Sequence, residues 1–139
     1  MPPSVMLTPM PDVEMALLYA LVPLEPEIRF VTSMPAGDLT KITARIRRVS
    51  GGSGSAHGAI WVDRPIVDID VWGQVGNATA QDVSIAARDI QADIMSLMGI
   101  QVMNGVIQHV ITVSGPKLVA EANPNLARNN ASYEVRIHP

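Results

Sequence analysis

Hydrophobic and polar positions recur along the chain with two different periods, and these periods predict its helices and strands. Apolar residues return every three to four positions from about Asp12 to Leu21 and from Thr79 to Met98, which predicts two amphipathic helices. Alternation of apolar and polar residues predicts half-buried strands. The segments that alternate are 28–32, 40–49, 65–72, 106–113 and 131–138. The expected order is one helix, three strands, a second helix and two strands.

The ends of both helices carry their own signals. Asp12 can cap the first helix, and Thr79 with Asp82 three residues later approximates a capping box at the second. Gly99 follows the last turn, where a left-handed residue is expected. Helices and strands in this order favour a single α+β domain over residues 1–139. Its two layers would be a mixed or mainly antiparallel sheet of about five strands and two helices packed on one face.

Three segments contribute little to such a core and are therefore expected to contact neighbouring proteins. Residues 1–11 contain four prolines, which predicts an extended arm that cannot join the interior of a sheet. Residues 50–59 are rich in glycine and serine and predict a flexible loop. Residues 114–130 predict a loop longer than most connections, which favours an interface role.

Composition and charge exclude several functional classes. The chain of 139 residues has no cysteine, so disulfide frameworks, thiolate metal sites and cysteine nucleophiles are excluded. Its net charge is −3, and the basic residues form no broad stripe of the kind that binds duplex nucleic acid. The one dense basic group, Arg45, Arg47 and Arg48, is expected on a solvated or salt-bridged strand face. Neither a signal peptide nor a membrane span is predicted.

The strongest candidates for catalysis are Asp68 and Asp70, because their spacing places both carboxylates on one face of a strand. Paired carboxylates can share a proton or hold a divalent cation. However, no third ligand or general acid can be identified beside them. The simpler interpretation is that they pair with arginines such as Arg45 or Arg47.

Other sequence features give no catalytic or binding site. The glycine-rich segment leads into a strand, whereas a phosphate-binding loop leads into a helix. The three histidines lack the i,i+4 spacing of a helical metal site, and no Gly-x-Ser-x-Gly motif is present. We therefore predict no catalytic residue, no cofactor and no metal.

The second half of the chain carries an ordered series of short motifs. They are Val67–Gly73, Leu97–Gly99, Val113–Pro116, Asn123–Leu126 and Ala131–Val135. This succession resembles the tail terminator proteins of long, non-contractile-tailed bacteriophages, especially those of actinobacterial hosts. The resemblance covers roughly residues 60–139 and depends on the order of the motifs, since each motif is short.

The resemblance implies a virion protein with no enzymatic activity. In that family a hexameric ring caps the tail tube, ends its polymerisation and provides the joint to the head. The implied partners are other copies of the chain, the tail tube protein and the head–tail connector or head-closure protein, with assembly in the host cytoplasm. Viral DNA would pass through the ring without specific binding. A lumen lined by aspartates would repel it, and the candidates are Asp68, Asp70, Asp82, Asp89 and Asp93.

The residues that we expect at contacts with neighbours lie on strand faces and in the long loop. They are Arg45, Arg47, Asp68, Asp70, Pro116, Asn123, Asn125 and Arg128. Three other functions stay open. One is a different phage neck component, such as a head-closure or tail-completion protein. Another is a small regulatory α+β domain whose long loop closes over a metabolite, and the third is a metal-dependent enzyme that uses Asp68 and Asp70.

Overall fold

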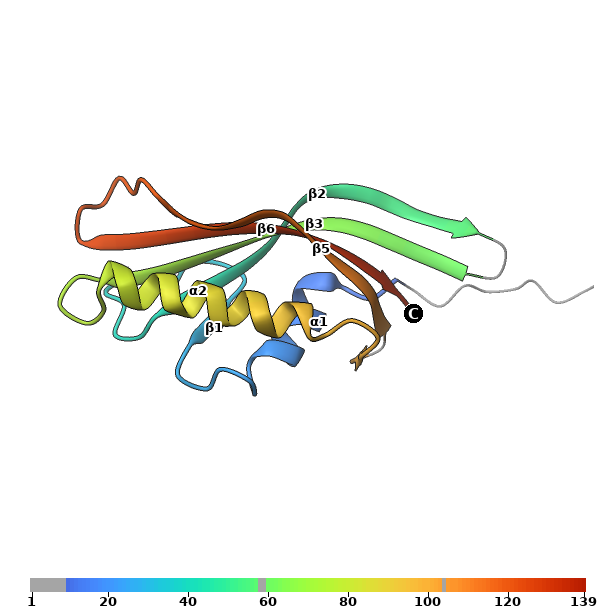
Figure 1. Cartoon of the computed structure of the whole chain (residues 1–139), viewed down its shortest axis with the longest axis horizontal. Helices are drawn as coiled ribbons and strands as arrows, with labels where there is room; N and C mark the ends of the chain where they lie inside the picture. The colour runs from blue at the N-terminus through green and yellow to red at the C-terminus, as the bar shows by residue number, and fades with distance from the viewer. Residues whose placement is uncertain (1–9, 58–59, 104) are drawn as a thin grey trace, which may run out of the picture.

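Six strands form one sheet, and both helices pack on the same face of it (Figure 1). The computed structural model describes residues 10–57, 60–103 and 105–139. In chain order the elements are α1 (Val13–Leu21), β1 (Arg29–Val31), β2 (Thr43–His57), β3 (Ile60–Gln74), α2 (Ala80–Met95), β4 (Gln101–Val102), β5 (Gly105–Val119) and β6 (Leu126–His138). The strand order is β1-β2-β3-β6-β5-β4, and only β1 and β2 are parallel.

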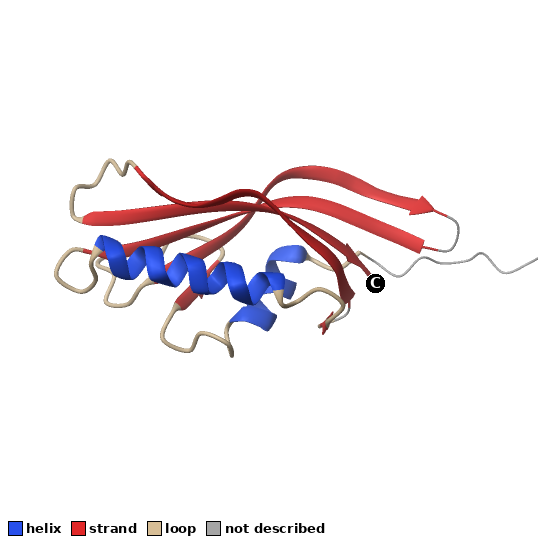
Figure 2. Cartoon of the chain, viewed as in Figure 1, coloured by secondary structure: helices blue, strands red, loops and turns tan. Residues whose placement is uncertain are grey.

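This architecture confirms the predicted two-layer α+β class, as Figure 2 shows by its single red layer of strands beside the blue helices. The sheet is mixed, as expected, and has one strand more than predicted. The additional strand, β4, has only two residues, so it is too short to produce an alternating pattern in the sequence.

Both helices begin at the capping residues that the sequence indicated. The Asp12 carboxylate accepts a hydrogen bond of 3.0 Å from the backbone amide of Glu14. Thr79 and Asp82 form a reciprocal capping box, with bonds of 3.0 and 3.1 Å between each side chain and the other backbone amide. Helix α2 ends at Met95, three residues before its predicted end at Met98. Gly99 has the predicted left-handed conformation, with a φ of 80°, but it lies in the turn that follows the helix. No helix in the described residues has the length and apolar character needed to cross a membrane.

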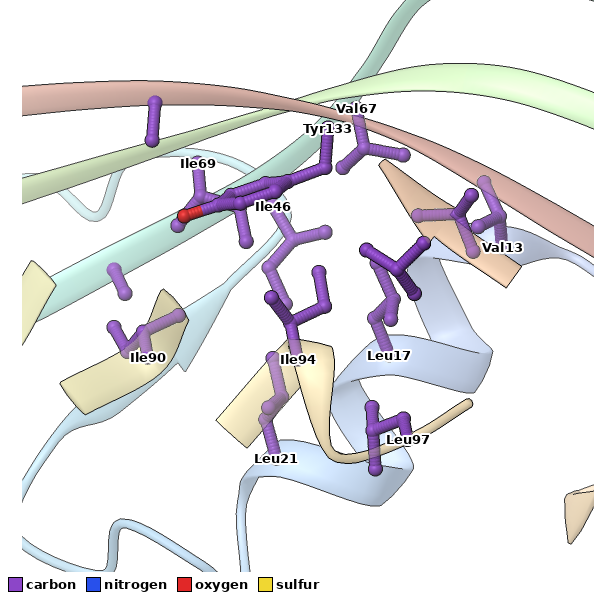
Figure 3. Close-up of a cluster of buried hydrophobic side chains, with 14 of the residues drawn as sticks. Val13, Leu17, Leu21, Ile46, Val67, Ile69, Ile90, Ile94, Leu97 and Tyr133 are labelled. Carbon is purple, nitrogen blue, oxygen red and sulfur yellow. The ribbon is translucent and has the colours of Figure 1, made fainter. Parts of the chain in front are cut away.

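The core lies between the helices and the inner face of the sheet (Figure 3). Ile46, Ile69 and Tyr133 lie on the side of the sheet that faces the helices, and the Tyr133 ring extends along the sheet. Full burial of an aliphatic side chain of this size stabilises a fold by about 1.5–3 kcal/mol. Burial also raises the pKa of Tyr133 to about 12. Its hydroxyl group has no hydrogen-bond partner among the described residues.

Most of the segment predicted as a flexible loop at residues 50–59 belongs to strands. Strand β2 continues to His57 and stays paired with β3, so this part of the loop prediction is wrong. The pairing shifts register between Arg48 and Ser50 and again between Gly52 and Ser55. Irregularities of this kind accommodate extra residues within a ladder, and glycine tolerates the backbone angles that they require. The paired ends of β2 and β3 extend beyond the layer of helices (Figure 1).

The long loop predicted at residues 114–130 is much shorter in the structure. Strand β5 continues to Val119 and β6 begins at Leu126, which leaves 120–125 as the connection. The register of β5 against β6 shifts between Thr112 and Ser114 and between Ser114 and Lys117. These shifts interrupt the alternation that marks a strand in the sequence, so the pattern there indicated a loop.

The predicted arm at residues 1–11 is described only at its last two positions. Met10 packs against the core, and Pro11 is buried beside Gly105 at the start of β5. A Cβ atom on Gly105 would lie 2.3 Å from Cγ of Pro11. Residues 10 and 11 therefore belong to the folded body, and the prediction for residues 1–9 lies outside the described residues.

Both edges of the sheet are only partly covered. Strand β1 pairs with residues 43–45 of β2. At the opposite edge, β4 pairs only with Gly105 and Val106 of β5. Within the described residues, the outer sides of β2 beyond Arg45 and of β5 beyond Val106 therefore pair with no strand.

Candidate functional site

The face of the sheet opposite the helices carries a group of charged side chains from β2, β3 and β6. Their positions follow from strand register, because Asp70 is paired with Arg45 on one side and with Asn130 on the other. On β3, Val67, Ile69 and Val71 are buried in the core, so alternation places Asp68, Asp70 and Trp72 on the opposite face. This division of β3 agrees with the prediction from the sequence.

Asp70 is the centre of this group, which we call the Asp70 network. Its carboxylate is 0% exposed and accepts hydrogen bonds from Arg45 Nη2 at 2.9 Å, Arg128 Nη2 at 2.8 Å and Asn130 Nδ2 at 2.8 Å. A fourth bond, from Arg128 Nε, is 3.1 Å long. Burial by itself raises the pKa of Asp70. The hydrogen bonds from Arg45, Asn130 and Arg128 outweigh burial, so the pKa lies below its ordinary value.

Trp72 lies against the same two arginines and completes the network. The guanidinium carbons of Arg45 and Arg128 lie 5.0 and 5.5 Å from the centre of the Trp72 ring, within cation–π distance. The indole Nε1 donates a hydrogen bond of 3.1 Å to Glu121 Oε2. This bond lowers the pKa of Glu121. Because Glu121 belongs to the connection between β5 and β6, Trp72 attaches that connection to the open face of the sheet.

A second, weaker pair lies beside the network. Asp68 faces Arg47 across β2 and β3, with 3.9 Å between charged atoms, and accepts a hydrogen bond of 2.6 Å from Ser132 Oγ. The expected pairing of Asp68 and Asp70 with arginines is therefore confirmed. Both Asp70 oxygens are already occupied by donors, and the described residues include no group of three or more acidic or histidine side chains suited to a metal ion.

The predicted contact residues are only partly brought together. Arg45, Asp70 and Arg128 meet in the network, with Arg47 and Asp68 adjacent to it. Three others lie elsewhere, and two of them are in the connection 120–125. The side chain of Asn123 accepts a 2.9 Å hydrogen bond from the amide of Asn125. Pro116 lies in β5 and lines a pocket beside α2.

Three members of the network were missed in the sequence. Trp72 and Asn130 continue the alternation of Asp70 and Arg128, so strand periodicity could have identified both. Glu121 has no comparable signal, because its position depends on the conformation of the connection between two strands.

The predicted aspartate lining does not form one surface. Asp70 is buried and neutralised by arginines, so it presents no free charge. Asp82 and Asp89 line a pocket of the helical layer, whereas Asp68 and Asp70 lie on the opposite face of the sheet. The five aspartates therefore cannot face a single lumen together.

The side chains of the Asp70 network hold one another in place and form a polar surface on the sheet. Its cations and carboxylates bond to one another, and its aromatic ring is 4% exposed. Such a group can hold three strands and a loop in register and can present the edges of two guanidinium groups to a neighbouring protein.

The fold can be compared with that of known proteins. No protein-family model and no curated protein sequence matches the chain. A comparison with solved structures finds one described as "Virion of native gene transfer agent (GTA) particle", with a TM-score of 0.61 and 11% sequence identity. The match covers 91% of this chain and 95% of that chain.

Another solved structure carries no functional description. It has a TM-score of 0.45 and 12% identity, covers 88% of this chain and 92% of that one, and supports no argument. At such identities a structural match establishes the fold alone. The chain thus shares its fold, over nearly its full length, with one chain of a gene transfer agent particle.

Proposed function

We propose that this chain is a structural virion protein that forms a ring at the end of a phage-type tail tube. The observation that carries the proposal is the match to a chain of the gene transfer agent virion, which covers 91% and 95% of the two chains. The motifs between residues 60 and 139 supply the more specific part, since their order resembles that of phage tail terminators. The ring would be hexameric, as this resemblance implies.

The surface of the chain supports a role in assembly. Long stretches of β2 and β5 have no strand on their outer sides among the described residues, so they can pair with other chains. The carboxylates first considered for catalysis are instead hydrogen-bonded within the sheet. The proposal requires three partners: other copies of the chain, the tail tube protein and the connector.

The experiment that tests the proposal combines particle size with tube capping. Purified protein should form rings visible by negative-stain electron microscopy, in amounts that increase with concentration. Added to polymerising tail tube protein from the same phage, it should shorten the tubes and be found at one end of each tube. A chain that stays monomeric at every concentration and leaves tube length unchanged would contradict the proposal.

A further inference from the structure

Helix α2 separates two surface pockets of opposite charge. The basic pocket, of about 260 Å³, is lined by Ser84, Arg88, Pro116, Lys117, Leu118 and Asn129. The acidic pocket, of about 250 Å³, is lined by Glu25, Glu27, Ile28, Ile42, Asp82, Ile85, Ala86 and Asp89. Both pockets use residues of α2, and the turn of 100° per residue places Arg88 and Asp82 on opposite flanks of its buried side.

The basic pocket contains two cationic side chains that are not engaged in ion pairs within the described residues. Neither Arg88 nor Lys117 forms an ion pair within the described part of the chain, and Lys117 Nζ donates only to the hydroxyl of Ser114, at 2.9 Å. Asn129 also lines the pocket and is 2% exposed. The two cations of this pocket therefore have no anionic partner within the described residues.

The four carboxylates of the acidic pocket likewise lack cationic partners and form no ion pair within the described residues. A hydrogen bond with the nearby Asp93 carboxyl, burial and the charges of Asp93, Asp89 and Glu27 raise the pKa of Glu25 to about 7. Like charges held this close repel one another, and a cation placed beside them would relieve the repulsion.

We propose that the basic pocket of one copy binds the acidic pocket of the next copy, so that α2 helices form the head-to-tail contact of the ring. This inference rests on the proposed function, because it names the surface through which the copies of the ring associate. Contact between different patches on opposite flanks of a subunit is heterologous, and such contacts form a ring when the rotation between successive subunits closes. The Arg88 guanidinium is suited to this role because it can bind carboxylates through two parallel hydrogen bonds.

Exchanging the charges of two adjacent residues tests this contact directly. Arg88→Glu places a carboxylate opposite the acidic pocket, and Asp89→Arg places a cation opposite the basic pocket. We expect each single substitution to weaken association by about tenfold or more, because each creates like-charge contacts. The double variant Arg88→Glu/Asp89→Arg keeps the net charge and should return association to within about threefold of the wild type.

Association is measured by analytical ultracentrifugation, with circular dichroism to show that each variant is folded. Arg64→Glu is the matched control, because Arg64 is an exposed cation of β3 outside both pockets and should leave association unchanged. Rings that persist in Arg88→Glu would overturn the contact while leaving the proposed function intact. The contact would be overturned in the same way if the double variant fails to recover or if Arg64→Glu weakens association equally. A wild-type chain that never associates would refute both proposals.

Discussion

Replacing Asp70 with asparagine isolates the contribution of the Asp70 network to stability. The substitution keeps the shape of the side chain but removes its charge, and it replaces one acceptor oxygen with a donor that faces other donors. Asp70 is 0% exposed, while its partners Arg45 and Arg128 are 18% and 28% exposed. Removing one member of a buried ion pair costs about 3–5 kcal/mol. The two arginines keep part of their hydration, so we expect the lower value, about 3 kcal/mol.

Asp68→Asn is the matched control on the same strand and the same face. Asp68 is 21% exposed, its partner Arg47 is 46% exposed, and their charged atoms are 3.9 Å apart. Exposed pairs of this kind contribute less than about 1 kcal/mol. Equilibrium unfolding in urea at pH 7 measures the free energy of unfolding of both variants and of the wild type. Equal losses in the two variants, or a loss below about 1 kcal/mol in Asp70→Asn, would refute the assigned role of the network.

The pH dependence of the difference in unfolding free energy between the wild type and Asp70→Asn provides a second check. The pKa of Asp70 is lowered from an ordinary value of 3.8, so the folded state binds its proton less tightly than the unfolded state. The stabilisation is therefore fully present above the unfolded pKa and is lost as pH falls through the folded pKa. The difference between wild type and Asp70→Asn should stay constant from neutral pH down to about 5 and shrink only below about 4.

Three further substitutions have defined outcomes. Tyr133→Phe removes a buried hydroxyl that has no partner in the described structure, so the free energy of unfolding should stay unchanged or rise by up to about 1 kcal/mol in urea titration. Gly105→Ala would bring a methyl group within 2.3 Å of the Pro11 ring, and calorimetry should show a melting temperature lower by at least about 5 °C. Asp93 and burial raise the pKa of Glu25 from 4.5 to about 7, so the wild type should lose about 1 kcal/mol of stability as pH rises through this interval. Urea titrations at several pH values should show that Glu25→Gln abolishes this loss. If the stability of the variant depends on pH as that of the wild type does, the raised pKa of Glu25 is contradicted.

Much of the fold was predictable because local signals agree with it. The caps at Asp12 and Thr79 identified the starts of the two helices, whereas Gly99 placed the end of α2 three residues too late. Four strands, β2, β3, β5 and β6, extend beyond the segments predicted for them. In β2 and β5, register shifts interrupt the alternation of apolar and polar residues. Such shifts depend on pairing with a neighbouring strand, which a single sequence does not reveal.

The candidate site was predictable where it depends on alternation along one strand, and not where it depends on the order of the strands in the sheet. Asp68, Asp70 and their arginine partners were identified because a strand places every second residue on one face. The meeting of Arg128 with Arg45 over Trp72 could not be anticipated, since it depends on β6 lying between β3 and β5. The pairing of distant strands is a property of the tertiary fold.

The partly covered edges of the sheet have a consequence for handling the purified protein. Unpaired strand edges promote aggregation, and proteins commonly block them with proline, charged side chains or irregular pairing. The outer side of β5 carries Pro116, Lys117 and two register shifts within a few residues. On β2, the Glu14 carboxylate of α1 accepts a hydrogen bond of 3.0 Å from the amide of Arg48. Substitutions at these positions should first appear as lower solubility during expression, before any loss of fold is measurable.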